Sequence, residues 1–143
     1  MVRADSSGVG IEYQVAGEGR PVVLLHGFPD SGSLWRHQVT ALADAGFKVI
    51  VPDMRGYGAS DKPAEIDAYN ILYLVADVGA VLDHAGVQRA HVVGHDWGAA
   101  VAWGSSAHVS GPWRYERLDG PGHWMQLEAP HEVNRLLLDF LPA

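Results

Sequence analysis

The chain has 143 residues, no cysteine and a formal net charge of −7 at pH 7, from 10 Lys and Arg against 17 Asp and Glu. The absence of cysteine excludes disulfides, thiolate metal sites and thiol catalysis. The acidic balance lacks the basic surface that binds nucleic acid or anionic membranes. A hydrophobic content of 48% and this length predict one globular domain with a sizeable core.

The first thirteen residues contain no apolar stretch of the signal-peptide type. No apolar run approaches the roughly 20 residues that a membrane-spanning helix needs. We therefore expect a soluble, cytoplasmic chain that binds neither nucleic acid nor membranes.

Short apolar runs alternate with longer amphipathic stretches along the first two thirds of the chain. Residues 10–16 alternate loosely, which is typical of an edge strand. Continuous apolar runs predict strands buried on both faces, and helical spacing of apolar residues predicts the helices between them. Buried strands are predicted at 21–26, 47–52 and 90–93, and helices at 35–45, 69–84 and from 98 to 103. This alternation predicts an α/β fold with a mostly parallel sheet, whose functional residues follow the strand ends.

The last third of the chain has a different character. We divide the single domain into an N-terminal core at 1–104, a short linker at 105–111 and a C-terminal part at 112–143. In the C-terminal part, residues 112–118 alternate like a strand and residues 120–123 form a tight Gly/Pro loop. Residues 132–141 have the pattern of an amphipathic helix, with Pro130 suited to its first turn.

The pentapeptide Gly94-His95-Asp96-Trp97-Gly98 has the spacing of a nucleophile elbow, with Asp in the central position. The glycines allow the strand and helix backbones to approach closely while the central side chain projects from the turn. A helix N-terminus favours negative charge there, so the carboxylate stays ionised and nucleophilic. A plain helix N-cap would explain the Asp alone. It would not explain both glycines and the preceding apolar strand.

Four ordered stretches resemble the α/β-hydrolase superfamily, and within it the epoxide hydrolases with their haloalkane and haloacetate dehalogenase relatives. They are HGFPDSGSLWRHQ (26–38), PDMRGYGASDKP (52–63), VVGHDWGAAVAW (92–103) and DGPGHWMQLEAP (119–130). HGFP and the following WRHQ look more like epoxide hydrolases than dehalogenases.

The resemblance implies a role for each matching residue. Asp96 would attack carbon and form an alkyl-enzyme ester, which a water activated by His123 would hydrolyse. Backbone N–H groups of Phe28 and Trp97 would form the oxyanion hole, and the Trp97 indole would contact substrate or leaving group. The implied substrate is a small apolar epoxide, halide or ester, and neither a cofactor nor a metal is implied.

Relatives in this superfamily are longer, and this chain lacks their cap and their central-to-late core strands. The acid that orients the histidine normally lies on those strands. Asp119 and Glu128 are nearby carboxylates, but we expect both to be ordinary solvated charges. Epoxide opening also needs a proton donor, which the family takes from cap tyrosines. None of the chain's tyrosines matches such a position: Tyr13, Tyr57, Tyr69, Tyr73 and Tyr115.

We expect a truncated α/β-hydrolase fold with about five or six strands and no cap. In one arrangement, residues 112–118 return beside 90–93 by a right-handed crossover and bring His123 about 4.8 Å from the nucleophile strand. In the other, a second chain covers the exposed edge as a homodimer or a domain swap. The sequence predicts a hydrolase of epoxide hydrolase type with weak, promiscuous activity. A dehalogenase or esterase-like hydrolase, and a non-catalytic deletion product or minimal scaffold, are the alternatives.

Overall fold

The computed structural model describes residues 1–105, 111–112, 114–115 and 117–141. Its centre is a five-stranded sheet in the order β1-β2-β4-β3-β5. The strands are β1 (Val2–Ser6), β2 (Val9–Ala16), β3 (Arg20–Leu25), β4 (Phe47–Pro52) and β5 (His91–Gly94). β4, β3 and β5 run parallel, whereas β2 is antiparallel to both of its neighbours. The predicted parallel strands are therefore part of a mixed sheet.

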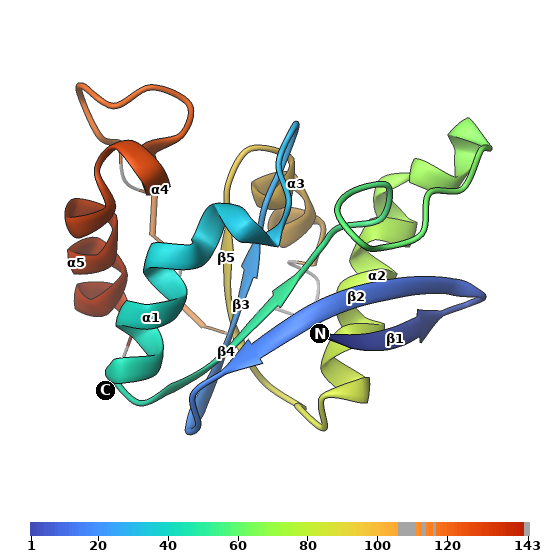
Figure 1. The fold of residues 1–143 in the computed structure, drawn as a ribbon, viewed down its shortest axis with the longest axis horizontal. Helices are drawn as coiled ribbons and strands as arrows, with labels where there is room; N and C mark the ends of the chain where they lie inside the picture. The colour runs from blue at the N-terminus through green and yellow to red at the C-terminus, as the bar shows by residue number, and fades with distance from the viewer. Residues whose placement is uncertain (106–110, 113, 116, 142–143) are drawn as a thin grey trace.

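Helices cover both faces of this sheet (Figure 1). On one face lie α2 (Ile71–His84) and α3 (Trp97–Gly104), and on the other lie α1 (Arg36–Asp44) and α5 (Pro130–Phe140). The short helices are η1 (Gly32–Trp35), η2 (Ile66–Tyr69) and α4 (Met125–Glu128). Residues 22–25 of β3 are all apolar and buried because they supply both layers: Val23 and Leu25 pack under α2 and α3, and Val22 and Leu24 under α1.

The prediction that residues 10–16 form an edge strand is wrong. β2 lies inside the sheet, paired with β1 on one side and with β4 on the other. The true edge strand, β1, points only Ala4 and Ser6 inward, and its other residues are exposed. Two small inward side chains produce no apolar alternation, so the sequence pattern gave no sign of this strand.

The strand predicted at 112–118 is also wrong for the residues that the structure describes. Four of these described residues are exposed and belong to no strand: Pro112, Arg114, Tyr115 and Arg117. An alternating pattern forms a strand only where one face is buried, and here neither face is. Among the described residues β5 is consequently the last strand of the sheet. Its covering by a second chain stays a prediction. Most of the predicted linker, residues 106–110, lies outside the described residues.

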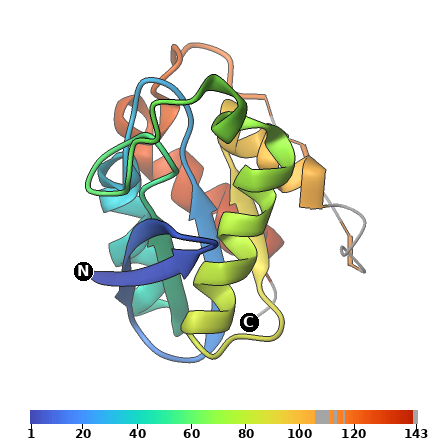
Figure 2. The same cartoon turned by 90° about the vertical axis from the view of Figure 1, so that its right-hand side faces the viewer.

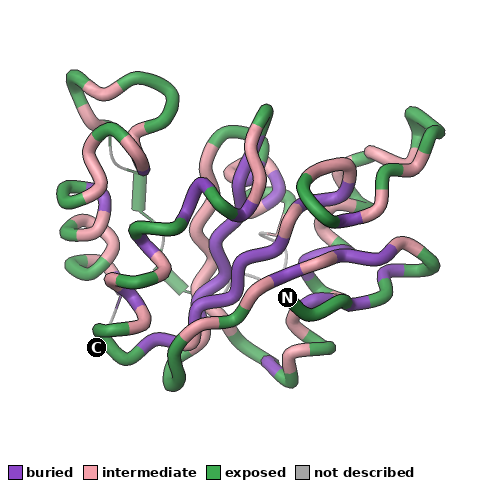
Figure 3. Tube along the Cα trace, in the orientation of Figure 1, coloured by how far each residue is buried: buried purple, intermediate pink, exposed green. Residues whose placement is uncertain are grey.

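The C-terminal helix α5 packs beside α1 (Figure 1). The turned view shows α2 on the near side of the sheet and α5 behind it (Figure 2). The buried Gln38 side chain joins the two helices, because its amide donates to Asn134 Oδ1 at 3.0 Å and to the Gln126 carbonyl at 3.3 Å. Burial is nevertheless concentrated in the strands, and α5 is mostly half-buried or exposed (Figure 3). No helix within the described ranges is long and apolar enough to span a membrane.

Candidate active site

The three parallel strands end at the same edge of the sheet, and the loop that follows each contributes to one site. The loop after β3 carries His26 to Pro29, and the loop after β4 carries Asp53 to Tyr57. β5 leads into residues 94–98, the elbow, which continues into α3. The motif positions predicted from sequence therefore converge.

The elbow has the close packing that its glycines predict. A β-carbon on Gly98 would overlap the Leu25 carbonyl, and one on Gly94 would overlap the Gly98 backbone. The His95 N–H donates to the Leu25 carbonyl at 3.0 Å, which ties the elbow to β3. Asp96 has φ 55° and ψ −123°, a conformation that side chains other than glycine rarely adopt. The turn thus holds its central side chain outward.

Backbone donors surround the Asp96 carboxylate. The Phe28 N–H donates to Asp96 Oδ1 at 2.8 Å, and the Trp97 backbone nitrogen lies against Gly27 beside this carboxylate. Gly27 makes room, since a β-carbon there would overlap the carboxylate. Burial alone would raise the pKa of Asp96, but the backbone N–H groups of Trp97 and Phe28 and the charges of His123 and His95 outweigh it and lower the pKa. Asp96 is therefore ionised at neutral pH.

His123 lies against the same turn, in the His loop (residues 120–124). Its Nε2 is 3.1 Å from the Phe28 carbonyl oxygen, and its ring centroid is 4.8 Å from that of His95. The neighbouring Trp124 donates its indole N–H to Asp30 Oδ2 at 3.0 Å. The predicted route through a strand beside β5 is absent from the described residues. Contacts to the loop after β3 bring His123 to the site instead.

The two carboxylates near the His loop differ from one another. Asp119 pairs with Arg117 at 2.9 Å, and both side chains are largely exposed, as expected of a solvated charge. Glu128 does more, because its Oε2 accepts the Gly122 N–H at 2.6 Å and fixes the start of the turn that carries His123. Within the described ranges, no group of three or more His, Asp and Glu side chains is arranged to hold a metal ion.

His26 has a role that sequence reasoning missed by treating it as a turn residue. Its side chain is 1% exposed, and its Nε2 is 2.9 Å from the Met54 backbone nitrogen. Its Nδ1 is 2.9 Å from the Gly27 carbonyl oxygen, which can only accept. His26 is thus neutral with the proton on Nδ1, and burial lowers its pKa. It joins the loops after β3 and β4, and the only sequence signal was its place at the end of a buried strand.

A buried ion pair holds the loop after β4 against α2. Arg55 donates Nε to Asp77 Oδ2 at 2.9 Å and Nη2 to Asp77 Oδ1 at 2.7 Å, with both side chains at most 5% exposed. A third bond runs from Arg55 Nη1 to the Ala68 carbonyl at 2.8 Å. Asp53 fixes the start of the same loop by accepting the Gly32 and Ala59 N–H groups, each at 2.8 Å. These contacts make the loop a rigid wall of the site.

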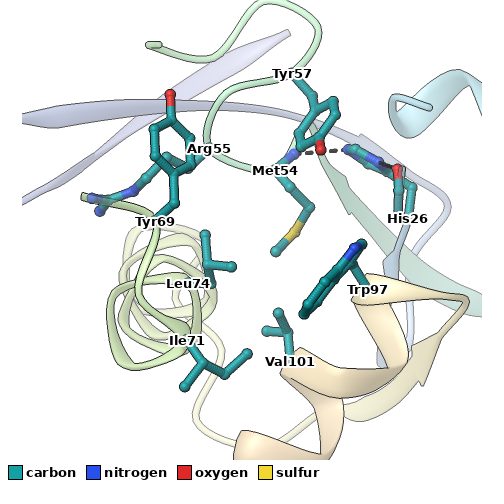
Figure 4. A pocket seen from close by; sticks show the side chains of 10 residues that line it. His26, Met54, Arg55, Tyr57, Tyr69, Ile71, Leu74, Trp97 and Val101 are labelled. Carbon is teal, nitrogen blue, oxygen red and sulfur yellow. Dashed lines mark hydrogen bonds between the residues drawn. The ribbon is translucent and has the colours of Figure 1, made fainter. Parts of the chain in front are cut away.

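A pocket of about 230 Å³ lies between this loop, α2 and α3 (Figure 4). Apolar side chains line most of it, and His26 and Gly27 line the end nearest the elbow. Trp97 forms another wall of the pocket, and its side chain is 62% exposed. The side chain of Phe28 is 60% exposed. The apolar lining is Met54, Ile71, Leu74 and Val101. The pocket can therefore hold an apolar group next to Gly27, which adjoins the Asp96 carboxylate.

The fold and the elbow define the class of this protein. The family model of the alpha/beta hydrolase fold matches residues 20–104, and the chain belongs to that family. Its similarity to epoxide hydrolases confirms the resemblance drawn from the four motifs.

Epoxide hydrolase A of Mycobacterium tuberculosis is 54% identical over 101 residues, which are 69% of this chain and 31% of the relative. The crystal structure of epoxide hydrolase A from Mycobacterium thermoresistibile gives a TM-score of 0.70 at 48% identity, over 73% of this chain and 34% of the other. An epoxide hydrolase from Vigna radiata gives 0.69 at 41% identity, over 71% and 32%. The chain spans about a third of the length of these relatives.

Proposed function

We propose that this chain is a hydrolase of the epoxide hydrolase type, acting on a small apolar epoxide. One observation carries the proposal: an ionised carboxylate on a strained elbow accepts the Phe28 N–H at 2.8 Å and adjoins Gly27, which lines an apolar pocket. The similarity to epoxide hydrolases over about 70% of the chain supports the same chemistry.

In the first step, Asp96 Oδ2, the oxygen that Phe28 does not bind, attacks an epoxide carbon. The bond from this carbon to the ring oxygen breaks, and a hydroxyalkyl ester of Asp96 forms. The N–H groups of Phe28 and Trp97 hold the carbonyl oxygen of the ester. They then stabilise its oxyanion when water attacks in the second step.

In the second step, His123 removes a proton from the attacking water. The Phe28 carbonyl accepts from Nε2 of His123, so neutral His123 carries its proton there and Nδ1 is the basic nitrogen. A backbone carbonyl thereby orients the imidazole, which is the task of the absent acid. It stabilises the imidazolium less than a carboxylate would, so we expect slow hydrolysis of the ester.

The test is covalent labelling of Asp96 by two substrates with the same hydrocarbon part, styrene oxide and 2-phenylethyl bromide. Mass analysis of the Asp96 peptide distinguishes the hydroxyalkyl ester left by the epoxide from the alkyl ester left by the bromide. It therefore separates the epoxide hydrolase hypothesis from the dehalogenase hypothesis. Asp96→Asn should abolish labelling, with a rate loss on the order of 10⁴-fold or more. His123→Gln should accumulate the ester, because its hydrolysis slows roughly 10²–10⁴-fold.

Three outcomes would contradict the proposal, in whole or in part. Absence of any ester on the unmodified chain would favour the non-catalytic alternative. Labelling that persists in Asp96→Asn would show that another residue reacts. An ester that is hydrolysed equally fast in His123→Gln would leave Asp96 as nucleophile but remove His123 as base.

A further inference from the structure

The pocket beside the elbow contains one polar side chain whose chemistry the two-step scheme does not use. Tyr57 belongs to the loop after β4 and lines the pocket together with Trp97 and Gly27. Figure 4 shows its ring entering the pocket with the hydroxyl end inward, beside His26. Gly27 lines the pocket with Tyr57 and adjoins the Asp96 carboxylate, so the carboxylate lies next to the pocket that Tyr57 enters.

The ring of Tyr57 is held in place by its surroundings. Its N–H donates to the Met54 carbonyl at 2.9 Å, and its carbonyl accepts the Ser60 N–H at 3.1 Å. Its ring meets the buried His26 imidazole edge-on, with centroids 5.4 Å apart at 85°. A phenol fixed in this way keeps its hydroxyl in one position relative to the site.

The hydroxyl of Tyr57 is free to bond a ligand. Across the described part of the chain, no protein group is hydrogen-bonded to it, whereas the Tyr69 hydroxyl in the same pocket donates to the Pro63 carbonyl at 2.8 Å. Burial, followed by the charge of Asp96, raises the pKa of Tyr57. The phenol is therefore protonated at neutral pH and senses the charge of the nucleophile.

We propose that Tyr57 is the catalytic acid of epoxide opening, donating its hydroxyl proton to the epoxide oxygen as Asp96 attacks the carbon. The inference rests on the proposed function. As the C–O bond breaks, its electron pair stays on oxygen, which takes the Tyr57 proton and becomes a hydroxyl. The phenolate regains a proton from water, which the open pocket admits. The apolar lining holds the hydrocarbon substituent, so the substrate is a small aryl or alkyl epoxide.

The leaving group supplies a sharp test. An epoxide oxygen leaves as a strongly basic alkoxide and needs a proton, whereas bromide leaves as a stable anion without one. Tyr57→Phe should therefore slow labelling of Asp96 by styrene oxide roughly 100-fold and leave labelling by 2-phenylethyl bromide within about twofold. Tyr73→Phe is the matched control: Tyr73 lies outside the pocket, against Arg55, and loss of its hydroxyl should change neither rate.

The outcomes separate this inference from the function beneath it. If Tyr57→Phe reacts with styrene oxide at the rate of Tyr73→Phe, Tyr57 is not the acid, although Asp96 can still be the nucleophile. A slowing of both substrates to the same extent would mean a structural effect and would also overturn the inference. If 2-phenylethyl bromide labels no variant, the labelling rates of Tyr57→Phe and Tyr73→Phe by styrene oxide decide alone whether Tyr57 is the acid. If the unmodified chain forms no ester, both proposals fail together.

Discussion

The elbow and the His loop meet at one site, but they are held there by different kinds of contact. Around Asp96, glycines let three backbone segments pack too closely for any other side chain, and backbone hydrogen bonds join the elbow to β3. The His loop is exposed and is held by single bonds from Glu128, Trp124 and His123 to neighbouring groups. The position of Asp96, the proposed nucleophile, is thus a property of the core, whereas that of His123, the proposed base, depends on a few surface contacts. Four variants test this difference.

The largest effect is expected from the buried ion pair beneath the pocket. Asp77→Asn leaves the Arg55 guanidinium buried without its counter-charge and should lower the free energy of unfolding by about 3–5 kcal/mol. Asp119→Asn makes the same change in the exposed pair with Arg117, where the loss should stay below about 0.5 kcal/mol. Urea unfolding of both variants measures the contrast. Equal losses would contradict the contrast between the buried ion pair of the core and the exposed pair before the His loop.

A smaller effect is expected from His26. His26→Leu leaves the Met54 N–H without an acceptor and should lower the free energy of unfolding by about 1–3 kcal/mol at pH 7. The Asp96 labelling rate should fall too, because the loops after β3 and β4 lose their link.

The same variant should change how stability depends on pH. Burial lowers the pKa of His26 below 6.5 in the folded chain, while the unfolded chain titrates near that value. Below pH 6.5 the unfolded state therefore binds a proton that the folded state does not, and stability falls from pH 7 to pH 5. His26→Leu should lose less stability over this range. The remaining loss of stability includes a contribution from His95, because burial also lowers the pKa of His95. An identical pH dependence in both chains would exclude a buried neutral His26.

The smallest effect on stability is expected in the His loop. Trp124→Phe removes the indole N–H bond to Asp30 and should lower the free energy of unfolding by about 1 kcal/mol or less. Formation of the Asp96 ester should not change, but its hydrolysis should slow because His123 is less well anchored. Time-resolved mass analysis of the ester follows both steps. Slower ester formation in this variant would mean that the His loop also shapes the nucleophile side of the site.

Sequence patterns predicted best what local chemistry dictates. The strand over 47–52 has the predicted bounds, and the glycines around Asp96 predicted the elbow because few other turns need both of them. Sequence patterns failed where the structure of a segment depends on partners far away in the chain. Residues 112–118 have the alternation of a strand, but the described ones find no surface to cover. Nothing near Val2–Ser6 reveals that this strand pairs with β2.

The site divides in the same way. We could predict where Asp96, Phe28 and Trp97 lie, because each belongs to a short motif that also specifies its local backbone geometry. The roles of His26 and Arg55 could not, because each depends on a residue at least 22 positions away, Met54 in one case and Asp77 in the other. Tyr57 was considered as one tyrosine among five, and only the folded loop distinguishes its unbonded hydroxyl from that of Tyr69.

The positive φ of Asp96 has a consequence for how this position can evolve. A residue other than glycine held in such a region is destabilised by about 1–3 kcal/mol. Glycine at position 96 would relieve that strain and, on stability alone, would be the better choice. The proposed reaction requires a carboxylate there. Selection for a more stable fold and selection for turnover therefore favour different amino acids at the same codon, so Asp96 reports which of the two has prevailed.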